Sequence, residues 1–145
     1  MAGSEGSRRA PAAFGTFSLL PIDTLRPHEE IDPTKIDELR LTIEEESAVL
    51  EPVLVARGSW VVLNGHHRVE ALRRLGARLV PAWVVDYEDE AIIVDRWPRS
   101  SVEEVPDKAT ILARAQAGRL YPPKTSRHTV RRRLPKRKTP LAVLF

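Results

Sequence analysis

Cysteine is absent from this chain of 145 residues, which excludes a disulfide framework and any chemistry that needs a thiol. Long apolar runs are absent as well, because no window approaches the roughly eighteen residues of a membrane-spanning helix. The first fourteen residues contain Arg8 and Arg9 but no apolar core, so they do not resemble a secretory signal. We therefore expect a cytoplasmic protein that makes no membrane contact.

The apolar content is that of one modest folded core. Hydrophobic residues make up 42% of the chain, which suits a single domain with tails. We predict a disordered leader over residues 1–15, a folded domain over 16–130, and a basic C-terminal tail over 131–145 that packs back on the domain.

Positive charge is concentrated near the C-terminus. Residues 124–138 contain eight Lys and Arg and no acid, whereas the rest of the chain has 15 basic against 20 acidic residues, a balance of −5. A mildly acidic body with one basic segment favours a polyphosphate ligand at least as much as nucleic acid. No aromatic residue lies within the basic block at 131–138, so base stacking is not supported. Nucleic acid is therefore a less favoured partner that the tail leaves open.

The hydrophobic pattern predicts a small α/β domain. Helical spacing and capping signals indicate helices over residues 33–46, 66–75 and 106–118. Apolar runs indicate strands over residues 16–22, 53–55, 60–63 and 80–85, the middle two joined as a hairpin.

The most informative segment is Leu63–Leu72, in which an apolar run leads through Asn-Gly-His-His-Arg into an amphipathic helix. Free N–H groups at a helix start, together with Arg68, form a phosphate site. His66 and His67 are adjacent, so they point about 100° apart on a helix and do not both face one small ligand. The same geometry makes metal binding by the pair alone unlikely, and the plain alternative is that both histidines cap and pack.

Three other segments are open to two interpretations each. Glu29, in a loop between prolines, is either a general base or solvated surface charge. Residues 122–128, with two hydroxyls, two cations and an imidazole after Pro-Pro, either embrace phosphate or form a disordered basic tail. Trp97 follows an apolar run, and local sequence favours a core position for it over a pocket wall.

The strand, the Asn-Gly-His-His-Arg turn at residues 64–68 and the following helix are similar to the phosphate-binding turn of the ParB/sulfiredoxin superfamily. Sulfiredoxins have a catalytic cysteine in this turn, which excludes their activity here. Chromosome-partition ParB proteins have Gly-Glu-Arg-Arg and a helix-turn-helix domain, neither of which this sequence shows. The free-serine kinase branch, with Asp-Gly-His-His-Arg, resembles the turn most closely.

The resemblance to free-serine kinases extends over residues 17–130. Those kinases have Lys-Pro-His-Glu early in the chain, similar to residues 26–29, and Asp-Tyr after the motif helix, similar to residues 86–87. A tryptophan follows, as Trp97 does here, and Pro-Lys-Thr-Thr-Arg-His near the C-terminus is similar to residues 123–128. The resemblance implies a compact α/β (α+β) domain of the ParB/sulfiredoxin type, with a small mixed sheet flanked by helices.

The resemblance also implies an activity: transfer of a phosphoryl group from ATP or ADP, with Mg²⁺, to the hydroxyl of free L-serine or a close hydroxy amino acid. The roles it implies are catalysis by Glu29 and His67, phosphate or nucleotide binding by Gly65, His66, His67, Arg68, Lys124, Thr125, Ser126, Arg127 and His128, and amino-acid binding by His28, Glu29, Trp97 and Arg127.

One departure from the family pattern bears on the metal. Asn64 stands where the kinases have aspartate, so this weak candidate metal ligand lacks a negative charge. The change favours, as the alternative, a ParB-like module that binds nucleotide or DNA without kinase activity. The sequence leaves open the donor, the acceptor and the oligomeric state.

Overall fold

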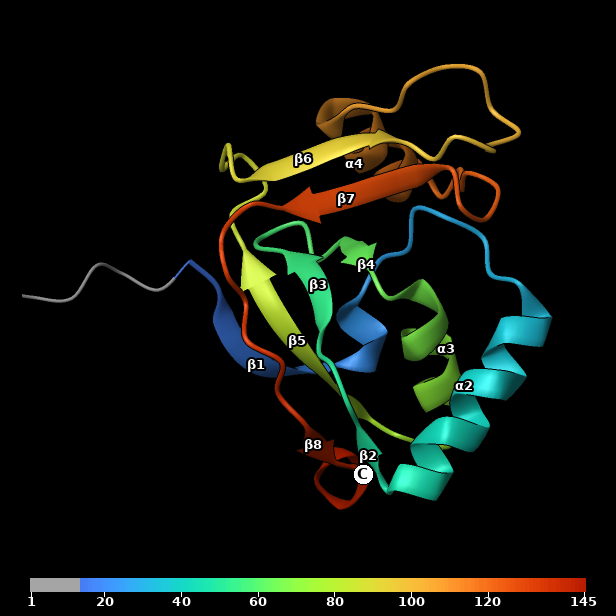
Figure 1. Ribbon diagram of the computed structural model, residues 1–145, viewed down its shortest axis with the longest axis vertical. Coiled ribbons are helices and arrows are strands. Elements are labelled where there is room, and N and C mark those ends of the chain that lie inside the picture. Colours follow the sequence, from blue (N-terminus) through green and yellow to red (C-terminus); the bar gives the residue numbers. More distant parts are fainter. Residues whose placement is uncertain (1–13) are drawn as a thin grey trace, which may run out of the picture.

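The computed structural model describes residues 14–145 (Figure 1), so most of the predicted leader lies outside the described residues. At its centre is a four-stranded mixed sheet with the order β1-β5-β3-β4. β1 is antiparallel to β5, β5 is parallel to β3, and β3 is antiparallel to β4. The strands are β1 (Thr16–Pro21), β3 (Val53–Ala56), β4 (Val62–Asn64) and β5 (Leu79–Val85). The predicted small mixed sheet is confirmed.

Two helices, α2 (Pro33–Glu46) and α3 (His66–Arg74), lie together on one side of the sheet (Figure 1). α2 begins as predicted, because Asp32 Oδ1 accepts from Thr34 N at 3.0 Å and proline occupies the first helical position. None of the helices within residues 14–145 is long and apolar enough to cross a membrane.

The third helix, α4 (Lys108–Ala117), begins two residues later than predicted. The sequence suggests Pro106 as its start, but Asp107 is the cap: its Oδ1 accepts from Thr110 N at 2.7 Å. A carboxylate that satisfies a free helical N–H defines the helix start more strongly than the preceding proline does. Gly118 ends the helix with φ +70°, as expected.

The main core lies between α2, α3 and the sheet. It includes Ile36 from α2, Leu72 from α3, and Val53 and Val80 from the sheet, all fully buried. The C-terminus closes this core: β8 (Thr139–Pro140) pairs with β2 (Ala48–Val49), and a 3-10 helix at Leu141–Leu144 buries Leu144 completely.

A separate two-stranded ribbon crosses one end of the sheet, close to the start of α3 (Figure 1). It is made of β6 (Ile92–Arg96) and β7 (Ser126–Val130), which run antiparallel with Arg127 opposite Asp95. The alternative of a disordered basic tail for residues 122–128 is therefore wrong, because the backbone from Ser126 onward forms a ladder with β6.

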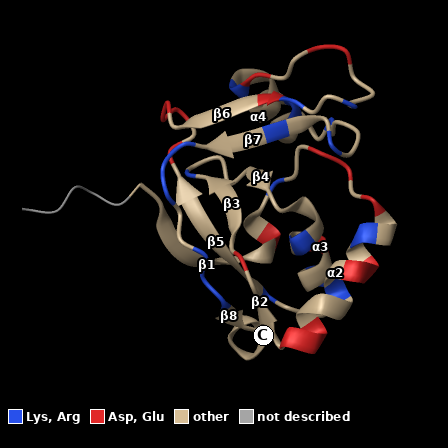
Figure 2. Cartoon of the chain, in the orientation of Figure 1, with Lys and Arg blue, Asp and Glu red and all other residues tan. Residues whose placement is uncertain are grey.

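The basic residues that follow β7 lie along the outer side of the sheet. Figure 2 shows Lys and Arg on this segment between β7 and β8. Trp83 Nε1 donates to Pro135 O at 3.1 Å, and the Arg137 guanidinium lies 3.8 Å from the ring centre of Phe17. Contacts with Trp83 and Phe17 of the sheet thus hold the segment between β7 and β8 against the sheet.

Leu144→Ala is expected to lower the free energy of unfolding by about 3 kcal/mol, because it removes a fully buried side chain from the main core. The neighbouring Val143 is 48% exposed, so Val143→Ala serves as the matched control and should change stability by less than about 0.5 kcal/mol. Urea denaturation measures both, and equal effects of the two substitutions would contradict the packing described.

Candidate active site

The turn that leads into α3 requires glycine at position 65. Gly65 has φ +106°, and a Cβ atom there would lie 2.5 Å from Val53 Cγ1. The first N–H groups of α3, like those of any helix, have no intrahelical acceptor, and no side chain caps the helix at Gly65 to replace it. Uncapped N–H groups with the positive end of the helix dipole favour an anion at this position.

The two adjacent histidines hold this turn to the loop that precedes α2. His66 Nε2 accepts from His28 N at 3.2 Å, and His67 Nε2 accepts from Asp32 N at 2.9 Å. Each imidazole is therefore neutral, with its proton on Nδ1. Burial, assisted by the charge of His28, lowers the pKa of His66 to about 3, and burial also lowers the pKa of His67. Though they point in different directions, both side chains reach one cavity.

The loop held in this way carries Glu29, which is only 8% exposed. Its Oε1 accepts from Lys124 N at 3.0 Å, and its Oε2 accepts from Ser126 N at 2.8 Å and from Ser126 Oγ at 2.5 Å. Burial alone would raise the pKa of Glu29, but the hydrogen bonds from His28 and Ser126 outweigh it and lower the pKa to about 2. The carboxyl is therefore ionised at neutral pH.

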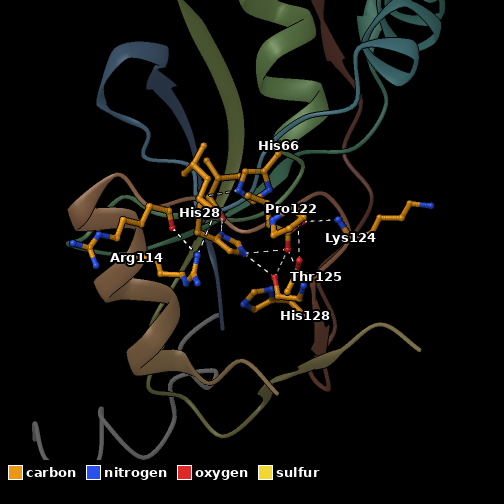
Figure 3. Close-up of polar contacts among 12 residues, drawn as sticks. His28, His66, Arg114, Pro122, Lys124, Thr125 and His128 are labelled. Carbon is orange, nitrogen blue, oxygen red and sulfur yellow. Dashed lines mark hydrogen bonds and ion pairs between the residues drawn. The ribbon is translucent and has the colours of Figure 1, made fainter. Parts of the chain in front are cut away.

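His28 is fully buried behind this carboxylate. Its Nδ1 donates to Val62 O at 2.8 Å, and its Nε2 lies 2.7 Å from Ser126 Oγ. Figure 3 shows the ring between His66 and the segment with Thr125 and His128. Both ring nitrogens of His28 are thus engaged inside the protein, so the ring has no free atom for the substrate contact that the sequence led us to expect.

Residues 122–128 form the opposite wall of the site, but not all of them face it. Thr125 is fully buried and its hydroxyl donates to Pro122 O at 2.7 Å, so its expected contact with a nucleotide has no free donor. Lys124 takes a left-handed backbone, φ +58°, and presents its N–H to Glu29. Arg127 forms two hydrogen bonds of 2.9 Å with Asp95 and lies 5.1 Å from the ring centre of Trp97.

His128 has one ring nitrogen without a partner among residues 14–145. Its Nε2 lies 2.8 Å from the hydroxyl of Tyr87, whereas the buried Nδ1 has no hydrogen bond. Burial raises the pKa of Tyr87, so the phenol keeps its proton and donates it, and burial lowers the pKa of His128 to about 3. The neutral imidazole therefore carries its proton on Nδ1, which is buried and has no hydrogen-bond acceptor among the described residues.

These side chains surround one cavity of about 590 Å³. Of the residues expected at the site, the cavity wall contains Glu29, Asn64, Gly65, His66, His67, Arg68, Trp97, Lys124, Ser126, Arg127 and His128. The turn and Glu29 thus meet in space. Trp97 is 40% exposed and forms part of this wall, so the local preference for a core position is wrong.

The structure differs from the sequence prediction at Arg68, which is only partly available to an anion, and at Lys35, which was not expected at the site. Arg68 Nη1 donates to the backbone oxygens of Glu51 (2.8 Å) and Pro52 (3.1 Å), so only the rest of its guanidinium is available to an anion. Lys35 of α2 also lines the cavity, and a side-chain contact with Lys124 lowers its pKa. Lys35 was missed because a lysine in a first helical turn has no local signature.

Tyr87 and Asp95 were missed as functional neighbours for a different reason. Tyr87 is known in the sequence only as part of an Asp-Tyr match, and Asp95 is one acid among many. Their partners, His128 and Arg127, lie 41 and 32 residues further on. Only the pairing of β6 with β7 brings them together.

For Mg²⁺, the described residues offer few ligands. No cluster of three or more His, Cys, Asp or Glu suited to a metal occurs within residues 14–145. Asn64 is exposed on the cavity wall and provides one neutral oxygen. Such a wall fits Mg²⁺ only as an ion held mainly by ligand phosphates and water, which is how Mg²⁺ is commonly bound.

Comparison with known proteins agrees with this fold. The model of the ParB N-terminal domain matches residues 8–96, more than half of the chain. The chain therefore belongs to the ParB N-terminal domain family.

Two curated relatives carry different descriptions. An ATP-dependent L-serine kinase of Staphylothermus marinus is 37% identical over 83 residues, covering 54% of this chain and 33% of the relative. A ParB-like protein of Sulfolobus acidocaldarius is 36% identical over 75 residues, covering 52% of this chain and 37% of the relative. The chain matches only about a third of the length of these relatives.

Among solved structures, a free serine kinase in complex with AMP superposes with a TM-score of 0.80 at 16% identity. The superposition covers 93% of this chain and 96% of that one. At this identity the likeness establishes the fold, and with 93% of the chain covered it extends beyond residue 96, where the family model ends.

Gly65→Ala is expected to lower the free energy of unfolding by about 2–4 kcal/mol, because strain at positive φ adds to the clash with Val53. The matched control is Gly58→Ala, where φ is +89° but a Cβ would meet nothing within 4 Å, and the cost should be about 1 kcal/mol. Denaturation midpoints test the pair. Equal costs would show that the close approach of α3 to β3 is not constraining.

Proposed function

We propose that this protein is a small-molecule kinase that transfers a phosphoryl group from ATP or ADP to the hydroxyl of free L-serine or a close hydroxy amino acid, giving the O-phospho product. The observation that carries the proposal is a buried, ionised carboxylate, Glu29, in the same cavity as an uncapped helix N-terminus. The names of the Staphylothermus relative and of the superposed free serine kinase support the same reaction. A cytoplasmic location, where nucleotides and free amino acids are abundant, fits it.

The cavity has the electrostatics of a polyphosphate site. The uncapped N–H groups of α3 point into a wall that also holds Lys35, Lys124 and Arg127. A side-chain contact with Lys124, together with burial and the positive charge of Lys124, lowers the pKa of Lys35. A chain of phosphates that binds both ammonium groups would relieve this repulsion, and we assign the donor phosphates to this place.

Glu29 then serves as the base toward the acceptor. Its Oε2 already accepts two hydrogen bonds, whereas Oε1 accepts only the Lys124 N–H. In the reaction the alcohol oxygen forms a bond to the terminal phosphorus, the bond from that phosphorus to the bridging oxygen breaks, and the electron pair leaves with the shortened nucleotide. The hydroxyl proton passes to Glu29 Oε1.

A base with so low a pKa suits this chemistry. It cannot remove the proton of a free alcohol to any extent, but it accepts the proton once the alcohol oxygen has begun to bond to phosphorus. Because the transition state of phosphoryl transfer is loose, the proton leaves late, and positioning with charge neutralisation supplies most of the rate. A carboxylate that is ionised at every physiological pH is also always ready to accept.

The remaining polar groups fit an amino acid. The outer edge of the Arg127 guanidinium is a donor for the acceptor's carboxylate, and Trp97 provides an apolar wall beside it. Mg²⁺, when bound with the nucleotide, would neutralise phosphate charge, and the side-chain oxygen of Asn64 on the cavity wall would be its ligand from the protein. The Nε2 of His67 already accepts a hydrogen bond from Asp32 N, so His67 would donate a hydrogen bond to phosphate through its Nδ1–H.

Glu29→Gln is expected to reduce kcat by about 10²–10⁴-fold with little change in nucleotide affinity, because the base is lost and the phosphate site is kept. Glu30→Gln is the matched control, since Glu30 is the exposed neighbour and does not line this cavity. Formation of phosphoserine from serine, Mg²⁺ and either ATP or ADP is the assay, with calorimetry for binding.

Two results would contradict the proposal. Full activity of Glu29→Gln would show that the base is misassigned. Binding of nucleotide by the wild-type protein without phosphorylation of any small hydroxy amino acid would favour the ParB-like binding module instead.

A further inference from the structure

Behind the catalytic cavity, three buried groups form a continuous chain of hydrogen bonds. Glu29 Oε2 lies 2.5 Å from Ser126 Oγ, and Ser126 Oγ lies 2.7 Å from His28 Nε2. Each of these two contacts needs one proton between its heavy atoms. The serine hydroxyl supplies one, so the second must reside on Glu29 or on His28.

The surrounding contacts place this second proton on His28. The Glu29 carboxylate accepts two backbone N–H groups, from Lys124 and Ser126, besides the serine hydroxyl, and three donors favour the ionised form. His28 Nδ1 already donates to Val62 O, so a protonated Nε2 gives this ring two donors with an acceptor for each. The His28 and Glu29 side chains then form a buried ion pair, with Nε2 and Oε2 3.5 Å apart.

We propose that Ser126 and His28 are positioning residues for the Glu29 base rather than ligand contacts. Together they occupy Oε2 with hydrogen bonds, leave Oε1 for the acceptor hydroxyl, and keep the carboxylate ionised. The role in catalysis rests on the proposed kinase function, whereas the protonated state of His28 stands on the hydrogen-bond count alone.

Neighbouring charged groups are consistent with one positive imidazole at this point. The ring centre of His66 lies 4.6 Å from that of His28, and that of His128 lies 5.6 Å away. Burial, with the charge of His28 as the next cause, lowers the pKa of both neighbours to about 3. The other titratable groups around this chain of hydrogen bonds are His67 from α3, Lys35 from α2, Asp95 from β6, Lys108 from α4 and Lys124 before β7.

The first test needs no activity. Ring ¹⁵N spectra of the free protein at pH 7 are expected to show two protonated nitrogens on His28, assigned by loss of the signals in His28→Gln. In Glu29→Gln the negative partner is gone, and His28 should show one protonated nitrogen. A wild-type His28 with a single protonated nitrogen would overturn the proposal, whether or not the protein is a kinase.

The second test separates positioning from folding. Ser126→Ala is expected to lower kcat about tenfold or more with an almost unchanged KM for nucleotide, because Oε2 loses a hydrogen bond to a charged group. It should also introduce an acidic limb in the pH–rate profile as the pKa of Glu29 returns toward its ordinary value of about 4. Ser126→Thr keeps the hydroxyl and should restore the flat profile; an unshifted profile in Ser126→Ala would overturn the proposal.

Discussion

The site depends on one buried carboxylate that ties together distant parts of the chain. Glu29 accepts the N–H groups of Lys124 and Ser126, which lie 95 and 97 residues further along. His28, the neighbouring residue of the same loop, also reaches the start of β7, because its Nε2 lies 2.7 Å from Ser126 Oγ. These hydrogen bonds matter for stability, because a carboxylate that is buried without such donors carries a large desolvation cost. The segment that leads into β7 therefore lies where its backbone N–H groups satisfy this charge.

Local sequence was sufficient for much of this arrangement. The helix over 33–46, its Asp32 cap, the hairpin of β3 and β4, and the turn at Gly65 all follow from signals within a few residues of each other. The turn was also readable as an anion site, since glycine at positive φ and an uncapped helix are local properties. Only the family resemblance predicted that Glu29 is a base, because a loop carboxylate has no local feature that distinguishes it from surface charge.

Apart from Lys35, the main parts that sequence reasoning did not reach involve pairing between residues far apart in the chain. β7 carries Ser126, Arg127 and His128, and polar residues of this kind conceal a strand when its partner is unknown. Once β6 lies beside it, Arg127 meets Asp95 and His128 comes within reach of Tyr87. Two other residues turned inward for separate reasons: the Thr125 hydroxyl donates to Pro122 O, three residues earlier, and His28 Nδ1 donates to Val62 O of β4.

The two ammonium groups that face each other from α2 and the segment before β7 carry a consequence for turnover. A side-chain contact with Lys124 lowers the pKa of Lys35, and a polyanion bound between the two ammonium groups would offset their repulsion. In the reaction proposed above, this polyanion would be shortened by one phosphoryl unit, so the spent nucleotide would offset the repulsion less well than the donor. In that reaction the same pair of lysines would attract the incoming nucleotide and then hold the product less tightly, which would favour its release from the protein.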